Sequence, residues 1–375
     1  MDPKTLLHGL FQLAEVTDAS DIHLAPDEKP YLRIGGALRD AEVEPLLGMA
    51  IQEIMEQCTM TTETSDRREA LMKSYATNGS VDYAYETIVP IKGEQRRVRY
   101  RINIFNTRGR MAAAIRRIKL TIPSFEQLHL PPIYETAISR RAKGIIIVGG
   151  ETGSGKSTTL ASMINYVNSR QSKHIVTIED PIEYVFANDR CRINQRELGE
   201  DFPSFALALK YVVRQDPDII MIGEIRDAET VETAIMAAET GHLVLTSLHT
   251  AGAVQTFYRI LNFFEPDRKP AIRQNLATTL VAIMNQMLLP SIKEGVPVVP
   301  GTEVLLNDAV VRGYIERGEE DGVGELLERE HEGMHDFNTA LVHMVDNSLI
   351  DPRVALAASP NPDKLRTMMS MHRPT

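Results

Sequence analysis

The stretch Gly150-Glu151-Thr152-Gly153-Ser154-Gly155-Lys156-Ser157 follows directly after the apolar run Ile145–Val148 and decides the fold class. Glycines in such a loop let backbone N–H groups converge on phosphate oxygens, the lysine supplies a positive charge, and the serine offers its hydroxyl to magnesium. A helix that begins near Ser157 adds its positive N-terminal end to the same phosphates. The sequence therefore predicts a strand, a phosphate-binding loop and a helix, with residues Gly150 to Thr158 binding a nucleotide.

The composition limits the class of protein. With 375 residues the chain is long enough for two domains, or three. No run reaches the roughly 18 apolar residues of a membrane span, and the start lacks the features of a signal peptide, so we expect a cytoplasmic protein. The two cysteines, Cys58 and Cys191, lie far apart, which excludes a disulfide framework and a cysteine-rich zinc site.

Charge is distributed unevenly along the chain. The net charge of −10 argues against a general nucleic-acid-binding surface, because such surfaces need clustered lysine and arginine. Between Arg96 and Lys119, however, there is no acidic residue. This segment holds eight arginines: Arg96, Arg97, Arg99, Arg101, Arg108, Arg110, Arg116 and Arg117. We expect this basic segment to meet an anionic partner.

The hydrophobic pattern predicts four regions: an α+β domain over residues 1–118, a proline-interrupted linker with a hinge over 119–132, an α/β core over 133–290, and a helical C-terminal region over 291–375. The first domain combines predicted helices at Lys4–Val16 and Met49–Cys58 with strands at Tyr31–Ile34, Val81–Val89 and Val98–Phe105.

The core alternates apolar strands with helices. Strands that are apolar throughout and separated by helices indicate a parallel sheet covered on both faces. The predicted strands are Ile145–Val148, Ile175–Ile178, Ile219–Ile222 and Leu243–Ser247, and the helices Ser157–Asn168, Phe205–Arg214 and Ala228–Thr240. From about Ala271 we expect helix, because Leu276, Leu280, Ile283 and Met287 recur at helical spacing.

Acidic residues follow two of the predicted strands. Glu224 comes after Ile219–Ile222 and is placed to handle magnesium or the attacking water, whereas Asp227 fits a helix cap. Glu179 follows Ile175–Ile178 and is a second candidate for the metal and water shell. Asp180 or Glu183 would orient Glu179. The predicted metal ligands are therefore Ser157, Glu179 and Glu224.

Two histidines flank the strand Val244–Ser247. His249 lies at its carboxyl end, where ligands bind in parallel sheets, and can contact the γ-phosphate. We expect His242, at the opposite end, to be structural.

These elements together resemble the type II/type IV secretion ATPases, and within them the PilT/PilU branch of type IV pilus retraction ATPases. The resemblance rests on the glycine-rich loop, TIEDPIEY at Thr177–Tyr184, RQDPDIIMIGEIRD at Arg214–Asp227 and AETGHLVLTSLHT at Ala238–Thr250. It begins at Ala19–Leu24, which matches the opening of the family's N-terminal domain, and covers nearly the whole chain.

The resemblance implies a RecA-like ATPase domain, a smaller N-terminal α+β domain of PAS-like type and a helical C-terminal tail. It also implies a homohexamer in which arginines reach the nucleotide of the neighbouring subunit. Arg99 and Arg101 match the family's RxRxNxF strand, and Arg116 matches a later arginine. Strand alternation places Arg97, Arg99 and Arg101 on one face and Tyr100, Ile102 and Ile104 on the other. For Arg96, Arg97, Arg108, Arg110 and Arg117 we expect a solvated basic edge.

The cysteine content separates branches of the family. Pilus-assembly and secretion members usually carry a tetracysteine zinc element, which two isolated cysteines cannot form, so retraction, and with it twitching motility, is favoured. The implied cofactors are ATP and Mg²⁺, and the implied partners are an inner-membrane pilus platform protein and a second retraction ATPase, with the chain peripheral at the inner membrane. Leu261–Arg268 and Phe337–Leu356 look closer to PilU, so a PilT-like and an accessory PilU-like role both stay open.

Three alternatives remain at this stage. The first is a pilus-assembly or secretion ATPase of the same superfamily. The second is a nucleic-acid motor, which the acidic balance disfavours and DNA-stimulated hydrolysis would support. The third is an ATP-binding regulatory subunit, which the intact Lys156 and Glu224 disfavour. Glu151 stands where relatives have a small residue or proline, and it weakens phosphate binding unless its side chain points to solvent.

Overall fold

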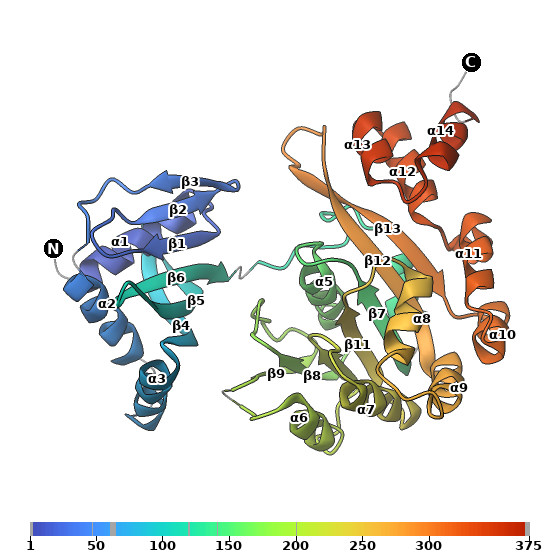
Figure 1. The fold of residues 1–375 in the computed structure, drawn as a ribbon, viewed down its shortest axis with the longest axis horizontal. Coiled ribbons are helices and arrows are strands. Elements are labelled where there is room, and N and C mark those ends of the chain that lie inside the picture. The colour runs from blue at the N-terminus through green and yellow to red at the C-terminus, as the bar shows by residue number, and fades with distance from the viewer. Residues whose placement is uncertain are drawn as a thin grey trace. The chain divides into compact units, whose positions relative to one another are not determined.

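The computed structural model describes residues 3–46, 48–60, 65–118, 121–140, 142–199 and 201–371. The chain divides into two compact units, Met1–Leu120 and Thr121–Thr375. The first runs from blue to cyan in Figure 1 and the second from green to red.

The first unit is an antiparallel sheet of six strands in the order β3-β2-β1-β6-β5-β4. Its strands are β1 (Asp21–Leu24), β2 (Tyr31–Ile34), β3 (Ala37–Asp40), β4 (Ser80–Ile91), β5 (Glu94–Thr107) and β6 (Arg110–Ile118). Its helices are α1 (Pro3–Val16), α2 (Gly48–Met60) and α3 (Ser65–Asn78).

Alternation along β5 builds the core of this unit. Val98, Tyr100, Ile102 and Ile104 are buried and share one apolar cluster with residues of α1 and α2, while the arginines between them face the other side. The ring of Tyr100 stacks on Phe11 of α1, with 4.1 Å between ring centroids. The predicted division of β5 into an arginine face and an apolar face is therefore confirmed.

The second unit is built on a seven-stranded sheet in the order β13-β12-β7-β11-β10-β8-β9. All neighbouring strands are parallel except β12 and β13. The strands are β7 (Gly144–Gly149), β8 (His174–Glu179), β9 (Arg192–Glu197), β10 (Ile219–Ile222), β11 (Leu243–Leu248), β12 (Leu280–Pro290) and β13 (Val298–Leu306).

Helices cover both faces of this sheet (Figure 1). Ile145 and Ile147 of β7 enter one apolar cluster, with residues of α6 to α11, and Ile146 and Val148 enter another, with α4 and α5. The predicted doubly covered α/β sheet is confirmed. The helices are α4 (Ile133–Arg140), α5 (Lys156–Asn168), α6 (Phe205–Val212), α7 (Ala228–Glu239), α8 (Ala253–Leu261), α9 (Lys269–Thr279), α10 (Ala309–Arg317), α11 (Asp321–Glu328), α12 (Phe337–Asp346), α13 (Pro352–Ala358) and α14 (Pro362–Met371).

The helix expected to continue from Ala271 is wrong beyond Thr279. Leu280–Pro290 is β12, a strand of the central sheet, and it forms a hairpin with β13. The residues from Leu280 to Gln286 are buried without interruption, and the first five are apolar; so short an apolar run fits a buried strand as well as a helix. The helical tail therefore begins with α10, at Ala309.

The proline-rich stretch before α4 belongs to the second unit. Phe125 and Leu130 are buried in the same cluster as α4 and α5, and the hydroxyl of Ser162 donates a hydrogen bond to the carbonyl of Pro123 at 2.7 Å. From Phe125 on, the segment expected as a linker is packed rather than free. No helix among the described residues is long and apolar enough to cross a membrane.

Candidate active site

The glycine-rich loop lies between β7 and α5, as expected. Gly150, Gly153 and Gly155 have φ angles of 149°, 80° and 90°, a region that side-chain-bearing residues rarely adopt. A Cβ on Gly150 would also come within 2.5 Å of the backbone oxygen of Gln286. Glycine is therefore required for the wrapped backbone that can surround a phosphate.

Lys156 is the first residue of α5 and is buried. Its ammonium group donates hydrogen bonds to the carbonyls of Gly150 and Glu151, each at 2.8 Å. Burial lowers the pKa of Lys156, while the negative charges of Glu224 and Glu183 act in the opposite direction. The two hydrogen bonds hold the loop around the ammonium group, and Glu183 and Glu224 are the acidic residues whose charges reach it.

The residues next to Lys156 complete the loop. Ser157 and Thr158 are partly exposed in the first turn of α5, and the hydroxyls of Thr158 and Tyr184 share a hydrogen bond at 2.8 Å. The side chain of Glu151 is exposed, so its charge points to solvent rather than into the loop. This orientation removes the expected repulsion between Glu151 and phosphates.

Glu224 is the centre of a polar cluster at the carboxyl edge of the sheet. One carboxylate oxygen accepts a hydrogen bond from Arg226 at 3.0 Å, and the other lies 3.2 Å from Nε2 of His249. Arg226 also donates to Asp180 at 3.1 Å. The segments that follow β8, β10 and β11 are thereby joined. Glu224 and His249 lie at the carboxyl ends of their strands, as predicted, and the structure adds the contact between them.

Glu179 ends β8 and is buried. Burial raises its pKa to about 7, although hydrogen bonds from Thr177 at 2.6 Å and Gln195 at 3.2 Å oppose this rise. These two side chains and the backbone N–H of Glu183, which also donates a hydrogen bond, orient Glu179, so Glu183 contributes as expected, though through its backbone. The side chain of Asp180, which we expected in that role, pairs with Arg226 instead. A carboxyl group with a pKa near 7 can take up or release a proton at neutral pH.

The two residues expected to be structural make structural contacts. Asp227 caps α7, where its carboxylate accepts a hydrogen bond from the backbone N–H of Thr230 at 2.8 Å. The ring of His242 lies 2.8 Å from the carbonyl of Ala237.

A magnesium ion at this site would need oxygen ligands. Ser157 offers a hydroxyl at the start of α5, and Glu224 offers a carboxylate whose charge reaches Lys156. Among the described residues, no group of three or more His, Cys, Asp and Glu side chains is arranged to hold a metal ion. The available donors fit an ion held by Ser157 and carboxylates together with phosphate oxygens.

Two of the predicted arginines of the first unit, Arg101 and Arg116, pair with carboxylates on its sheet. Arg101 pairs with Asp82 at 3.2 Å, and Arg116 pairs with Asp21 at 2.8 Å. Hydrogen bonds from Arg116 and Ser20 outweigh the effect of burial and lower the pKa of Asp21, so the pair is charged. Arg101 and Arg116 face each other across β5 and β6, and Arg99 lies two residues before Arg101.

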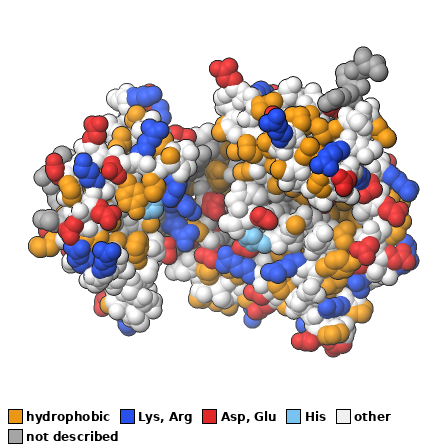
Figure 2. Space-filling view, turned by 45° about the horizontal axis from the view of Figure 1, so that its top comes forward, with side chains coloured by type: hydrophobic (Ala, Val, Ile, Leu, Met, Phe, Trp, Pro, Cys, Tyr) orange, Lys and Arg blue, Asp and Glu red, His pale blue; other side chains and the backbone are white. Residues whose placement is uncertain are grey.

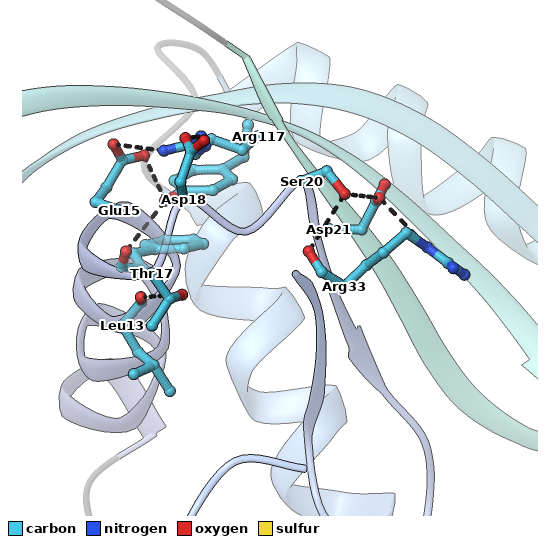
Figure 3. A network of polar contacts seen from close by, with 10 residues as sticks. Leu13, Glu15, Thr17, Asp18, Ser20, Asp21, Arg33 and Arg117 are labelled. Atoms are coloured by element: carbon cyan, nitrogen blue, oxygen red, sulfur yellow. Dashed lines mark hydrogen bonds and ion pairs between the residues drawn. The ribbon is translucent and has the colours of Figure 1, made fainter. Parts of the chain in front are cut away.

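Arg117 differs from the solvated edge that we expected. Its side chain is only 9% exposed and lies between Glu15 and Asp18, as Figure 3 shows. Arg96 and Arg97, by contrast, are exposed and pair with Glu94 and Glu86. On the face drawn in Figure 2, basic and acidic side chains are interspersed over both units. Because its side chain is enclosed and paired on both sides, Arg117 is part of the internal packing of the first unit rather than of this surface.

The comparisons with known proteins agree with this geometry. The family model described as "Type II/IV secretion system protein" matches residues 4–301. The chain belongs to this family.

Three relatives show which branch of the family the chain resembles. The twitching motility protein of Neisseria gonorrhoeae is 37% identical over 337 residues, covering 90% of this chain and 86% of that protein. The type IV pilus ATPase PilU of Pseudomonas aeruginosa is 35% identical over 364 residues, covering 96% and 91%. A crystal structure of the pilus retraction motor PilT with bound ADP matches with a TM-score of 0.85 and 37% identity, covering 96% of this chain and 99% of that one.

Sequence reasoning missed two groups of residues that this family member places at its site. Arg226 joins Glu224 to Asp180. Asn285 and Gln286 of β12 bond to Thr250 and to the glycine-rich loop. Two amides inside the apolar run Leu280–Leu289 were the available signal, because a buried strand carries polar side chains only where they have partners.

Proposed function

We propose that this chain is an ATPase whose hydrolysis of ATP powers the retraction of a type IV pilus. The observation that carries the proposal is the meeting of the glycine-rich loop, Glu224 and His249 at one edge of a parallel sheet, where such sheets bind ligands. The names of the relatives supply the pilus context, since they include a twitching motility protein and a retraction motor.

The residues take distinct roles in hydrolysis. The loop from Gly150 to Ser157 binds the phosphates, and Lys156 turns its ammonium from the loop carbonyls toward the β- and γ-phosphates. Ser157 would hold magnesium, which supplies charge neutralisation when bound. Glu224 positions the attacking water, His249 contacts the γ-phosphate, and Glu179, with its pKa near 7, is the alternative base.

Activity depends on oligomerisation in this proposal. The chain works as a homohexamer, and Arg99, Arg101 and Arg116 stabilise the transition-state charge at the nucleotide of a neighbouring subunit. Ring deformation then acts on a platform protein of the pilus machine at the inner membrane, where the cytoplasmic ring docks. A second retraction ATPase is a further partner if the chain has the PilU-like role.

The direct test is steady-state ATP hydrolysis by the purified hexamer, followed by pilus dynamics in a deletion strain. We expect magnesium-dependent turnover that DNA does not stimulate, and hyperpiliation with lost twitching motility when the gene is deleted. A strain without pili would indicate an assembly motor instead. Metal analysis adds a control, because stoichiometric zinc would contradict the assignment to the retraction branch.

A further inference from the structure

Gln286 lies on β12, and its side chain spans the glycine-rich loop. Its Nε2 donates a hydrogen bond to the carbonyl of Ser154 at 2.6 Å, and its Oε1 accepts one from the hydroxyl of Thr159 at 2.8 Å. All three residues are buried. One amide therefore joins the loop before Lys156 to the first turn of α5.

The packing around Gln286 leaves little room for movement. A Cβ on Gly150 would approach the backbone oxygen of Gln286 to 2.5 Å, and one on Gly155 would approach its Nε2 to 3.0 Å. Next to it, the hydroxyl of Thr250 donates to Oδ1 of Asn285 at 3.1 Å, which ties the same strand to the residue after His249. Strand β12 thus supports both ends of the loop and the end of β11.

The bond to Ser154 determines where an N–H group of the loop points. In a planar trans peptide, the C=O of one residue and the N–H of the next point in opposite directions. With the Ser154 carbonyl held on Gln286, the N–H of Gly155 is directed away from β12. Convergent N–H groups on the side away from the supporting strand are what a bound phosphate requires.

We propose that Gln286 is a positioning residue that orients the Ser154–Gly155 peptide for phosphate binding, an inference that rests on the proposed ATPase function. Gln286 acts through the backbone and has no contact with the reacting atoms. Losing it releases the peptide, so that the loop must reorder each time a nucleotide binds. The loss then appears in nucleotide affinity and KM more than in kcat.

The test measures ADP binding by calorimetry, and KM and kcat for ATP, on the full-length hexamer. Gln286→Met keeps the side-chain length but removes both hydrogen bonds of the amide. The freed peptide then loses the hydrogen bond from the Gly155 N–H to a phosphate, a charge-assisted contact, so we expect the affinity for ADP to fall about tenfold to a hundredfold. Thr159→Val removes only one of the two bonds and should have a smaller effect. It also provides a second variant if Gln286→Met folds poorly.

Gln286→Glu supplies a readout that packing alone would not change. An ionised carboxylate can still accept from Thr159 but repels the Ser154 carbonyl, whereas the protonated acid can donate to it. The affinity of this variant for ADP, taken relative to the unsubstituted protein at each pH, should therefore rise as the pH falls. Gln286→Met should show no such rise.

Asn307 provides the matched control. Its buried amide donates to the carbonyls of Ala277 and Leu280, at the end of β13 away from the loop. Asn307→Leu should lower thermal stability but leave ADP affinity unchanged. The inference is overturned if Gln286→Met binds ADP within twofold of the unsubstituted protein, or if Asn307→Leu loses as much affinity. Failure of the unsubstituted protein to bind ADP would instead overturn the proposed function itself.

Discussion

The arginines on β5 and β6 of the first unit and the polar groups around the glycine-rich loop of the second differ in how they are paired and how far they are exposed. The side chains of Arg101 and Arg116 are 40% and 69% exposed, and each pairs with one carboxylate, the exposed Asp82 and the buried Asp21. Lys156 and Gln286 are buried, and each makes two hydrogen bonds within its own unit. The two arginines are exposed to solvent, whereas Lys156 and Gln286 use their polar atoms on groups of the loop and of α5.

This difference indicates that the arginines can exchange their partners, whereas the glycine-rich loop is already formed before a nucleotide binds. An exposed ion pair contributes about 1 kcal/mol or less, so Arg101 can leave Asp82 for a phosphate at little expense. Arg116 is exposed too, but its partner Asp21 is buried and keeps Ser20 and Arg33 as partners when Arg116 moves. Buried hydrogen bonds resist rearrangement, because an unpaired buried group costs about 1–3 kcal/mol. The comparison predicts that substitutions in the loop impair binding, whereas substitutions of the arginines impair the chemical step.

The largest expected effect is that of Lys156→Ala. This variant removes the ammonium that contacts the β- and γ-phosphates, and with it the clamp on the carbonyls of Gly150 and Glu151. ATPase activity should fall below detection, a loss of about 10³-fold or more, while circular dichroism stays unchanged. Measurable turnover in a folded Lys156→Ala hexamer would contradict the role given to Lys156 in the preformed loop.

The arginine variants come next in size. A charge supplied from a neighbouring subunit is worth about 10³ or more in rate, so Arg101→Ala or Arg116→Ala should bind ATP but hydrolyse it poorly. The same is expected of Arg99→Ala. Arg97→Ala is the matched control, because Arg97 lies on the same face of β5 in an exposed pair with Glu86. It should keep near-normal turnover.

Mixed rings test whether these arginines act between subunits. An Arg101→Ala subunit contributes an intact loop and a Lys156→Ala subunit an intact arginine, so some interfaces in a mixture contain both. We expect partial recovery of ATPase activity after subunit exchange. If labelled subunits exchange and activity does not recover, the arginines act within their own subunit or only in its structure.

Much of this fold was predictable because the second unit is locally consistent. Strands such as Ile145–Val148 are apolar throughout, and their helices follow with ordinary spacing, so β7, β8, β10 and β11 were all predicted. Strand β12 was not, because a buried run such as Leu280–Gln286 has no period that distinguishes strand from helix. Its partners in the sheet are β7, which lies more than a hundred residues earlier, and β13.

The site was predictable to the extent that its residues follow strand ends. Glu224, Glu179 and His249 were found in this way. Gln286 and Arg226 were missed, since their partners, the loop and Asp180, are distant in the sequence, and the amides in Leu280–Leu289 indicate only that partners exist. Arg117 was misassigned for the same reason, because Glu15 and Asp18 are about a hundred residues away in the sequence.

Glu224→Gln separates ATP binding by the glycine-rich loop from the chemical step within the second unit. The amide keeps the size of the side chain but cannot serve as a base, so ATP binding should persist while the hydrolysis rate falls about 10²- to 10⁴-fold. Single-turnover kinetics with measured ATP affinity separate the two steps. Near-normal turnover would transfer the catalytic role to Glu179, whose pKa near 7 also suits it.

The smallest expected effect concerns stability and the half-buried carboxylate of Glu303. Glu303 of β13 accepts a hydrogen bond from the backbone N–H of Ala253 at 2.6 Å, and burial raises its pKa from 4.5 to about 7. The unfolded chain loses this proton near pH 4.5 and the folded protein only near pH 7, so Glu303 stabilises the fold fully below pH 4.5 and loses that contribution as the pH rises to 7. The contribution amounts to at most about 3 kcal/mol.

Thermal unfolding of the nucleotide-free protein across this pH range measures that contribution. Glu303→Gln cannot titrate, so its stability relative to the unsubstituted protein should increase between pH 4.5 and pH 8, with most of the gain complete by pH 7. Glu86, which is in an exposed pair with Arg97 on the first unit, is the control. Glu86→Gln should change stability by about 0.5 kcal/mol or less. If the two substitutions give the same flat pH dependence, the carboxylates of the two units are held alike, and the distinction between exposed and buried charge does not extend to β13.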